Sequence, residues 1–145
     1  MPLPEPRPGL VISYSYLWKR QADGGEISGR KDRPCAIIIA AETQAGESLV
    51  YAVPITHLVP AADSEAVEIP RNIKRRLGLD DAPSWIVVTE MNCFVWPGVD
   101  LRPVFADEPT RFVYGALPFD IFDKVKQAII RRLRARTISL VKRGE

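Results

Sequence analysis

The sequence predicts a mainly β protein of the α+β class, either a small barrel or a strongly bent sheet, with one long helix at its end. Several short segments rich in β-branched and aromatic residues alternate with turns that contain Gly or Pro between residues 10 and 114. A single amphipathic segment follows them. The 145 residues fit one domain, which at this size buries roughly two thirds of its unfolded surface.

Both ends of the chain are predicted to lie outside the folded domain. Residues 1–8 hold four prolines, which cannot pair within a sheet, so we expect a flexible, extended leader that ends at Gly9. Residues 9–136 are predicted to form the single domain. Residues 137–145 are then a tail, and the sequence does not predict whether it is ordered.

The strands are predicted from runs of β-forming residues that end at turn residues. The first is Leu10 to Trp18, and the polar loop from Lys19 to Asp32 follows it. A loop of this length is usually functional or disordered. The other predicted strands are Cys35 to Ala41, Leu49 to Thr56, Ala66 to Ile69, Trp85 to Thr89, Leu101 to Phe105 and Arg111 to Tyr114.

Two helices are predicted. Arg71 to Leu77 is a short basic helix with Gly78 as its left-handed cap. The second is amphipathic and spans about 118 to 135, because Pro118 suits a helix start and an apolar stripe follows at helical spacing. The stripe consists of Phe122, Val125, Ile129 and Leu133.

The composition argues against several classes of protein. No segment approaches the roughly 18 apolar residues of a membrane span, and the N-terminus has no signal-peptide core, so we expect a cytoplasmic protein. Cys35 and Cys93 lie in apolar segments, which indicates buried thiols rather than a disulfide. With His57 as the only histidine and no paired cysteines, the sequence predicts neither a metal site nor a cofactor.

The net charge of +2 conceals an asymmetry. Residues 118–145 carry eight Lys and Arg against three acidic residues, a charge of +5, so residues 1–117 carry −3. A second basic cluster is predicted on the short helix and the long loop, formed by Arg71, Lys74, Arg75, Arg76, Arg30 and Lys31, with Arg20 nearby. Aromatic side chains that could stack on bases are Tyr14, Tyr16, Trp18 and Trp96. Such a combination is typical of RNA-binding grooves, although charged runs also form ordinary solvated faces.

Arg33 and Thr56 are the candidate centre of a phosphate site. Arg33 enters one predicted strand and Thr56 leaves the next, so the two side chains can lie side by side. A guanidinium matches two phosphate oxygens, and a threonine hydroxyl can donate to a third. An ordinary surface arginine and an ordinary strand-end threonine would fit the same spacing.

Glu26 and Glu90 are the candidate proton-transfer groups. Glu26 lies in the long loop, and Glu90 follows the strand predicted from Trp85 to Thr89. A carboxylate near Arg33 would stay ionised and could accept a proton from a ribose hydroxyl. His57 follows Thr56 directly, so in a strand it would point to the opposite face.

The order of these segments resembles the MazF/PemK family of bacterial toxins, whose superfamily includes the gyrase poison CcdB. The similar segments are Pro8-Gly9-Leu10-Val11, the Glu26 loop leading to Arg33-Pro34, Val53-Pro54-Ile55-Thr56, Val87-Val88-Thr89-Glu90-Met91-Asn92 and Gly115-Ala116-Leu117-Pro118. The resemblance covers about residues 8–135.

The resemblance implies an SH3-like barrel and a homodimer that cleaves single-stranded mRNA without a metal. It also implies a cognate antitoxin and a bacterial cytoplasmic location. Arg33 and Thr56 fall on the catalytic arginine and threonine of that family. Glu26 falls near its loop acid, and Glu90 on an acidic position that some members use for proton transfer.

Three positions depart from the family pattern. Glu26 lies further from Arg33 than the loop acid usually does, and Asp32 places a negative charge beside Arg33. Val88 stands where some members have a second catalytic arginine. Asp32 and Val88 favour one alternative, a non-catalytic, CcdB-like protein that acts on a target such as DNA gyrase. A plain nucleic-acid-binding module is a further alternative.

Overall fold

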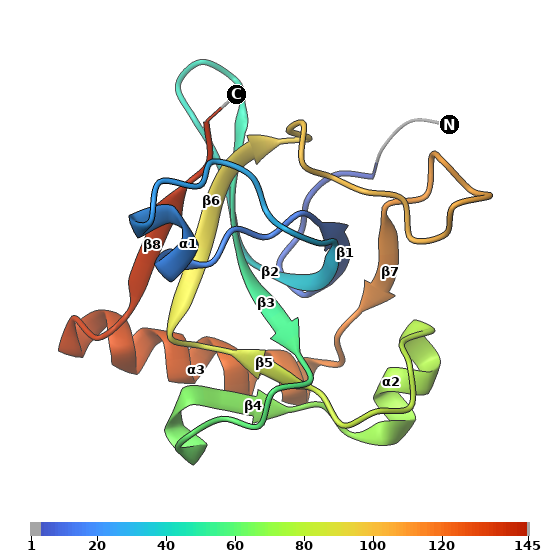
Figure 1. The fold of residues 1–145 in the computed structure, drawn as a ribbon, viewed down its shortest axis with the longest axis vertical. Coiled ribbons are helices and arrows are strands. Elements are labelled where there is room, and N and C mark those ends of the chain that lie inside the picture. Colours follow the sequence, from blue (N-terminus) through green and yellow to red (C-terminus); the bar gives the residue numbers. More distant parts are fainter. Residues whose placement is uncertain (1–3, 145) are drawn as a thin grey trace.

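The computed structural model describes residues 4–144 and shows a bent sheet with one long helix across it (Figure 1). The strands are β1 (Leu10–Tyr14), β2 (Arg33–Glu42), β3 (Ser48–Thr56), β4 (Ala66–Glu68), β5 (Trp85–Val87), β6 (Glu90–Trp96), β7 (Val113–Ala116) and β8 (Ser139–Lys142). The helices are α1 (Lys19–Asp23), α2 (Arg71–Leu77), α3 (Phe119–Ala135) and the 3₁₀ turn η1 (Asp63–Glu65).

The sheet is antiparallel except at one pair of strands. Its main path runs β4-β5-β3-β2-β1-β7, and β6 pairs with β3 on one side and in parallel with β8 on the other. β3 therefore pairs with three strands: β2 along most of its length, β6 in its first half and β5 at its end. The predicted α+β class is confirmed, and the sheet is bent but not closed into a barrel.

The core lies on both faces of this sheet. On the face toward α3, Val11, Ala36 and Val53 pack with side chains of the helix. On the other face, Ile12 and Cys35 pack with a second apolar cluster that contains Phe94, Val50, Ile37 and Tyr14. Because side chains alternate along a strand, a sheet buried on both faces needs apolar residues at nearly every position. This explains the unbroken apolar runs of β1, β2 and β3.

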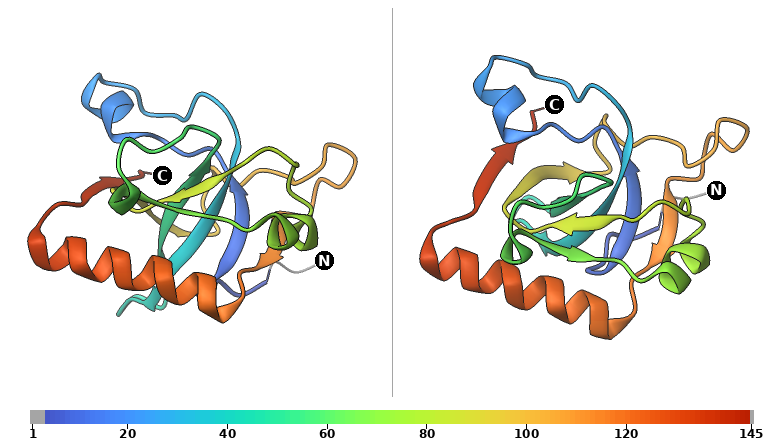
Figure 2. Two further views of the ribbon diagram at one scale, coloured as in Figure 1. Left: turned by 90° about the horizontal axis from the view of Figure 1, so that it is seen from below. Right: turned by 60° about the horizontal axis from the view of Figure 1, so that its bottom comes forward.

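Helix α3 crosses one end of the sheet, as the two further views show (Figure 2). Ile121, Val125 and Ile129 are buried at four-residue spacing and face the sheet. Pro118 is the residue just before the first helical turn. The predicted helix is confirmed, although Leu133 of the predicted stripe is largely exposed.

Several predicted boundaries were wrong. The first strand ends at Tyr14 rather than Trp18, and the loop that follows it begins with the helix α1. The strand predicted from Trp85 to Thr89 ends at Val87, so Glu90 begins β6 instead of ending a strand. The segment 101–105 forms only a single bridge, from Leu101 to Tyr14.

The two ends of the chain differ in how they attach to the domain. Within the predicted leader, residues 4–8 have no helix or strand, and residues 1–3 lie outside the described residues. The predicted tail contains a strand, because β8 pairs with β6, while residue 145 lies outside the described residues.

A buried arginine fixes β8 to the rest of the sheet. Arg143 follows β8 and is 8% exposed. Its guanidinium donates to the Ser15 carbonyl at 2.7 Å and to Asn92 Oδ1 at 3.0 Å, and it lies 3.0 Å from an Asp100 carboxylate oxygen. Asn92 also exchanges two hydrogen bonds with the backbone of Leu17. This network joins segments from both halves of the chain.

Replacing Arg143 by Met should lower the free energy of unfolding by about 3–5 kcal/mol, because two buried acceptors, the Ser15 carbonyl and Asn92 Oδ1, would lose a charged donor and Asp100 its nearer cation. Urea denaturation followed by tryptophan fluorescence measures the change. Lys142→Met is the matched control, since Lys142 is exposed on the same strand and should change stability by less than about 0.5 kcal/mol. Equal stability of the two variants would contradict the role given to Arg143.

Candidate functional site

Arg33 and Thr56 line one cavity of about 630 Å³. Arg33 is the first residue of β2 and Thr56 the last of β3. The two strands pair Cys35 with Pro54, and continuing this register by two residues places Arg33 opposite Thr56. The juxtaposition predicted from the sequence is therefore present. We call this hollow the Arg33 cavity.

The Arg33 guanidinium is half-buried and has few protein partners. Its Nη1 donates to the Ile55 carbonyl at 3.4 Å, and its centre lies 5.1 Å from the Trp18 ring, a cation–π contact. Its Nε is buried and donates no hydrogen bond to any described residue. Burial lowers the pKa of Arg33, yet a guanidinium remains charged at neutral pH. The group is a cation whose hydrogen-bonding capacity is largely unused, so an anion would be favourable there.

The Thr56 hydroxyl is oriented by the backbone that follows it. Thr56 Oγ1 accepts a hydrogen bond from the Leu58 amide at 3.1 Å. The chain leaves β3 at this point, and the contact holds the side chain at the strand end. Since this bond uses only an acceptor lone pair, the hydroxyl proton remains able to donate to a ligand oxygen.

Asp32 does not neutralise Arg33. Its carboxylate lies 3.5 Å from Nε of Arg102, and no ion pair between Asp32 and Arg33 is found within the described part of the chain. Asp32 still lines the Arg33 cavity. The negative charge of Asp32, which would compete with a phosphate for Arg33, is thus partly balanced by Arg102.

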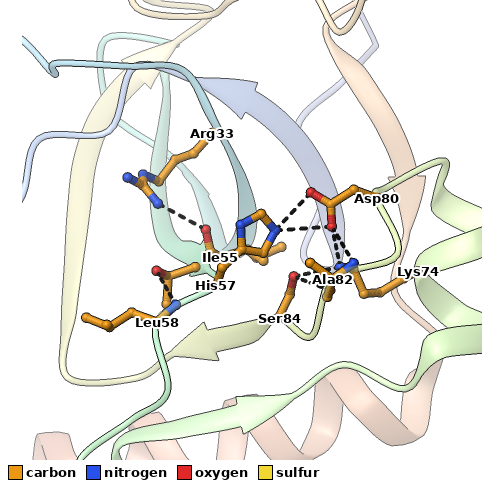
Figure 3. A network of polar contacts seen from close by, with 9 residues as sticks. Arg33, Ile55, His57, Leu58, Lys74, Asp80, Ala82 and Ser84 are labelled. Carbon is orange, nitrogen blue, oxygen red and sulfur yellow. Dashed lines mark hydrogen bonds and ion pairs between the residues drawn. The ribbon is translucent and has the colours of Figure 1, made fainter.

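His57 belongs to the same cavity, contrary to the expectation that it would face away from Thr56. β3 ends at Thr56 and the chain bends at His57, so strand alternation does not extend to it. The imidazole Nε2 lies 2.9 and 3.1 Å from the two Asp80 carboxylate oxygens. In Figure 3 the imidazole ring lies between the side chains of Arg33 and Asp80.

Lys74 holds the Asp80 carboxylate from beneath. Its side chain is almost fully buried, and Nζ donates to Asp80 Oδ1 and Ser84 Oγ, both at 2.7 Å, and to the Ala82 carbonyl (Figure 3). These contacts, with the one to His57, lower the pKa of Asp80. Lys74 was predicted to bind RNA, and in the structure its three ammonium protons are directed to internal acceptors.

The other predicted basic residues are exposed at the protein surface. Lys31 is exposed and lines the Arg33 cavity. Arg71, Arg75 and Arg76 are exposed on α2, the helix that also carries Lys74. Arg30 forms a bidentate ion pair with Glu26, at 2.8 and 2.9 Å, and lines a neighbouring hollow of about 310 Å³ that Arg33 shares.

The structure does not bring the two predicted glutamates to the Arg33 cavity. The ion pair with Arg30 lowers the pKa of Glu26, which lines a different hollow near the C-terminal strand. Glu90 accepts hydrogen bonds from the Tyr16 hydroxyl at 3.0 Å and the Lys19 amide at 2.9 Å. Both carboxylates are therefore engaged elsewhere.

The approach of the long loop depends on a glycine. A Cβ atom at Gly29 would lie 2.5 Å from the Tyr16 carbonyl oxygen and 2.7 Å from that of Ser15, so only glycine allows this close contact. The loop brings Arg30 and Lys31 beside Arg33.

Of the predicted stacking residues, Tyr14 and Tyr16 are buried in the core, and burial raises the pKa of both hydroxyls. Trp18 contacts Arg20 and Arg33.

Sequence reasoning missed several residues of the site. Asp80 and Ser84 come from the loop after α2, while Phe105 and Tyr114 come from the segment around β7. A carboxylate two residues after the helix-ending Gly78 was the one available signal for Asp80. No signal marked Phe105 or Tyr114, since their position depends on how distant segments pack.

Two further properties concern residues 4–144 alone. No group of three or more His, Cys, Asp or Glu side chains is arranged there to hold a metal ion. None of the helices in this range has the length and apolar character needed to cross a membrane.

Asp80→Asn should destabilise the protein at neutral pH, because buried Lys74 would lose its counter-ion. The folded pKa of Asp80 lies below its ordinary value of 3.8, so its stabilising contribution is present above that value and is lost as the pH falls through the folded pKa. The expected loss is about 1–2 kcal/mol at pH 7, at the low end for a charged hydrogen bond because water screens this half-exposed carboxylate. Urea denaturation between pH 7 and pH 2.5 measures it.

The matched control is Asp81→Asn, which removes the neighbouring exposed carboxylate. Its stability should follow that of the wild type at every pH. If the deficit of Asp80→Asn stayed constant down to pH 2.5, the proposed coupling of Asp80 to Lys74 would be incorrect.

The chain matches no protein-family model, and no curated protein or solved structure is significantly similar to it. The resemblance to MazF/PemK toxins consists of short segments in a shared order. The geometry of the Arg33 cavity is a separate observation, and it includes two of the residues that this resemblance singles out.

Proposed function

We propose that this protein is an endoribonuclease that cleaves single-stranded RNA and acts as the toxin of a toxin–antitoxin pair. The observation that carries the proposal is the placement of Arg33 opposite Thr56 in one open cavity. The sequence resemblance supports the same assignment, because it matches these two positions to a catalytic arginine and threonine.

The two side chains suit the charge that develops when RNA is cleaved by its own 2′ oxygen. Attack on phosphorus produces a phosphorane with additional negative charge on its oxygens. Arg33 supplies a fixed cation with unused donors, and Thr56 supplies a hydroxyl oriented by Leu58. Donors placed before the reaction stabilise such charge at little reorganisation cost. The products are a cyclic phosphate and a free 5′ hydroxyl.

The surroundings of the cavity fit a single strand of RNA. Lys31 lies at the cavity, and the exposed Arg71, Arg75 and Arg76 offer further phosphate contacts from α2. Phe105, which is 47% exposed, lines the same cavity and offers a face for base stacking. Stacking and phosphate contacts together bind single strands without requiring a duplex.

The remaining parts of the proposal come from the resemblance. They are an SH3-like arrangement of the strands, a homodimer, a bacterial cytoplasmic location and an antitoxin that covers the basic surface. Asp32 and Val88 are the two residues that favour the gyrase-poison alternative.

Asp32 pairs with Arg102, and Val88 is 1% exposed within the core, so neither residue prevents Arg33 from binding a phosphate.

Purified protein incubated with a long single-stranded RNA in EDTA should yield discrete products that end in a cyclic phosphate. Arg33→Ala and Thr56→Val should each slow cleavage by about 100-fold or more, since each removes a donor to the developing charge. Primer extension and end-group analysis of the products measure the effect. Arg134→Ala and Thr43→Val are matched controls, because Arg134 is exposed on α3 and Thr43 lies at the far end of the β2–β3 hairpin, where its hydroxyl likewise accepts a hydrogen bond from a backbone amide.

Intact RNA at a large excess of protein would contradict the proposal. A supercoiling assay with DNA gyrase separates the alternative, because a gyrase poison traps cleaved plasmid DNA and a ribonuclease does not. Cleaved plasmid together with intact RNA would transfer the assignment to the gyrase-poison class.

A further inference from the structure

Cleavage of RNA by its 2′ hydroxyl requires a group that accepts the hydroxyl proton. Neither Arg33 nor Thr56 can do so near neutral pH, because one is permanently protonated and the other is an alcohol. The predicted acceptors Glu26 and Glu90 do not line the cavity. A different residue must therefore supply this function if the proposed reaction occurs.

We propose that His57 is the general base of the Arg33 cavity and that Asp80 and Lys74 hold it in its working orientation. The inference rests on the proposed ribonuclease function. Histidine is suited to the task, because its unperturbed imidazole exchanges a proton close to physiological pH.

The contact with Asp80 determines which ring nitrogen is available. Nε2 lies within 3.1 Å of both Asp80 carboxylate oxygens, and an ionised carboxylate can only accept, so Nε2 carries the hydrogen. In the neutral ring, Nδ1 then presents a lone pair. Within the described residues Nδ1 makes no hydrogen bond, and in Figure 3 it lies on the side of the ring away from Asp80.

Asp80 is in turn fixed by groups that are buried or part of the backbone. Lys74 Nζ donates to Asp80 Oδ1 at 2.7 Å, and the Ala82 amide donates to the same oxygen at 3.1 Å. The buried ammonium keeps the carboxylate ionised and lowers its pKa. Lys74, Asp80 and His57 thus form a chain of contacts, and His57 lines the cavity next to Thr56 in the sequence.

The other ionisable side chains at the cavity do not compete for this role. Asp32 pairs with Arg102, and Asp80 is held by Lys74. Lys31 and Arg33 are cations, and burial raises the pKa of the Tyr114 hydroxyl, which remains protonated. The Asp32 carboxylate lies 3.5 Å from a guanidinium, whereas His57 Nδ1 presents a neutral proton-accepting atom that makes no hydrogen bond within the described residues.

The reaction balances with these groups. Nδ1 of His57 takes the proton of the 2′ hydroxyl while the 2′ oxygen forms a bond to phosphorus. The bond from phosphorus to the 5′ oxygen breaks, and that oxygen takes a proton from water. The imidazolium, stabilised by Asp80, afterwards releases its proton to solvent. Arg33 and Thr56 contact the phosphoryl oxygens throughout.

The test uses an RNA oligonucleotide that contains a site cut by the wild-type protein. His57→Ala should reduce the single-turnover rate by about 100-fold or more, the usual contribution of general base catalysis. Its affinity for the same oligonucleotide with a 2′-deoxy sugar at the cleaved position should be unchanged. Added imidazole should restore part of the rate, since the His57 side chain is 59% exposed and leaves an accessible space.

A second substrate distinguishes a base from an acid. When sulfur replaces the bridging 5′ oxygen, the leaving group no longer needs a proton. His57→Ala should remain as slow relative to the wild type on this substrate as on normal RNA. Loss of the difference would identify His57 as an acid and overturn the proposal.

Positioning by Asp80 is tested with Asp80→Asn, which should lower the rate by about 10-fold or more and leave 2′-deoxy oligonucleotide binding unchanged.

Folding of each variant is checked by urea denaturation. His57→Gln, which keeps a donor toward Asp80, serves if His57→Ala does not fold. If the wild type cleaves RNA and the His57 variants cleave equally well, only this inference fails. If the wild type cleaves no RNA, the proposed function fails with it.

Discussion

The pairing of β2 with β3 determines what the candidate site contains. The two strands are joined at the turn between Glu42 and Ser48, and their pairing runs to Cys35 and Pro54, two residues from Arg33 and Thr56. β3 also pairs with β5 and β6, so it cannot slide without breaking three sets of backbone hydrogen bonds. A shift of one residue would also turn the buried side chains of both strands to the wrong faces. The distance between the arginine and the threonine is thus set by the core and not by flexible loops.

A buried lysine couples the fold to the site. Enclosing an ammonium group away from water is costly unless it is paired and hydrogen-bonded, and Lys74 meets this requirement with Asp80, Ser84 and the Ala82 carbonyl. Its three acceptors all come from the loop between α2 and β5, which is thereby held in one conformation. The same contacts orient the carboxylate that His57 uses. The contacts of Lys74 therefore both stabilise this loop and orient the imidazole of His57.

Local patterns predicted much of the fold, and contacts between distant segments account for what they missed. The strands around Ile37 and Val53 and the helix around Val125 were recognisable because burial imposes a periodic or continuous apolar pattern. Strand β8 was not, since it depends on Arg143 reaching Asn92 and Asp100. The strand predicted from Trp85 to Thr89 was too long and β6 was not predicted, because this stretch supplies two strands with a bend between them.

Within the site, the placement of Arg33 against Thr56 followed from the predicted hairpin alone. Lys74 was grouped with exposed basic residues because it stands in a basic run, although it lies between Ile73 and Leu77 on the buried side of α2. A helical projection of this short segment would have separated it from its exposed neighbours. The roles of Asp80 and His57 needed the path of the chain after Gly78, which no local pattern determines.

The charges of the cavity follow a consistent arrangement. Two carboxylates line it, and each has a cationic partner: Asp32 lies against Arg102, and Asp80 against Lys74. Arg33 and the exposed Lys31 have no carboxylate partner among the described residues, so the half-buried charge of Arg33 is left unbalanced. A half-buried cation attracts an anion more strongly than an exposed one does, because less water screens it. The electrostatic field of the cavity therefore favours a phosphate at Arg33, and His57 and Thr56 line the same cavity.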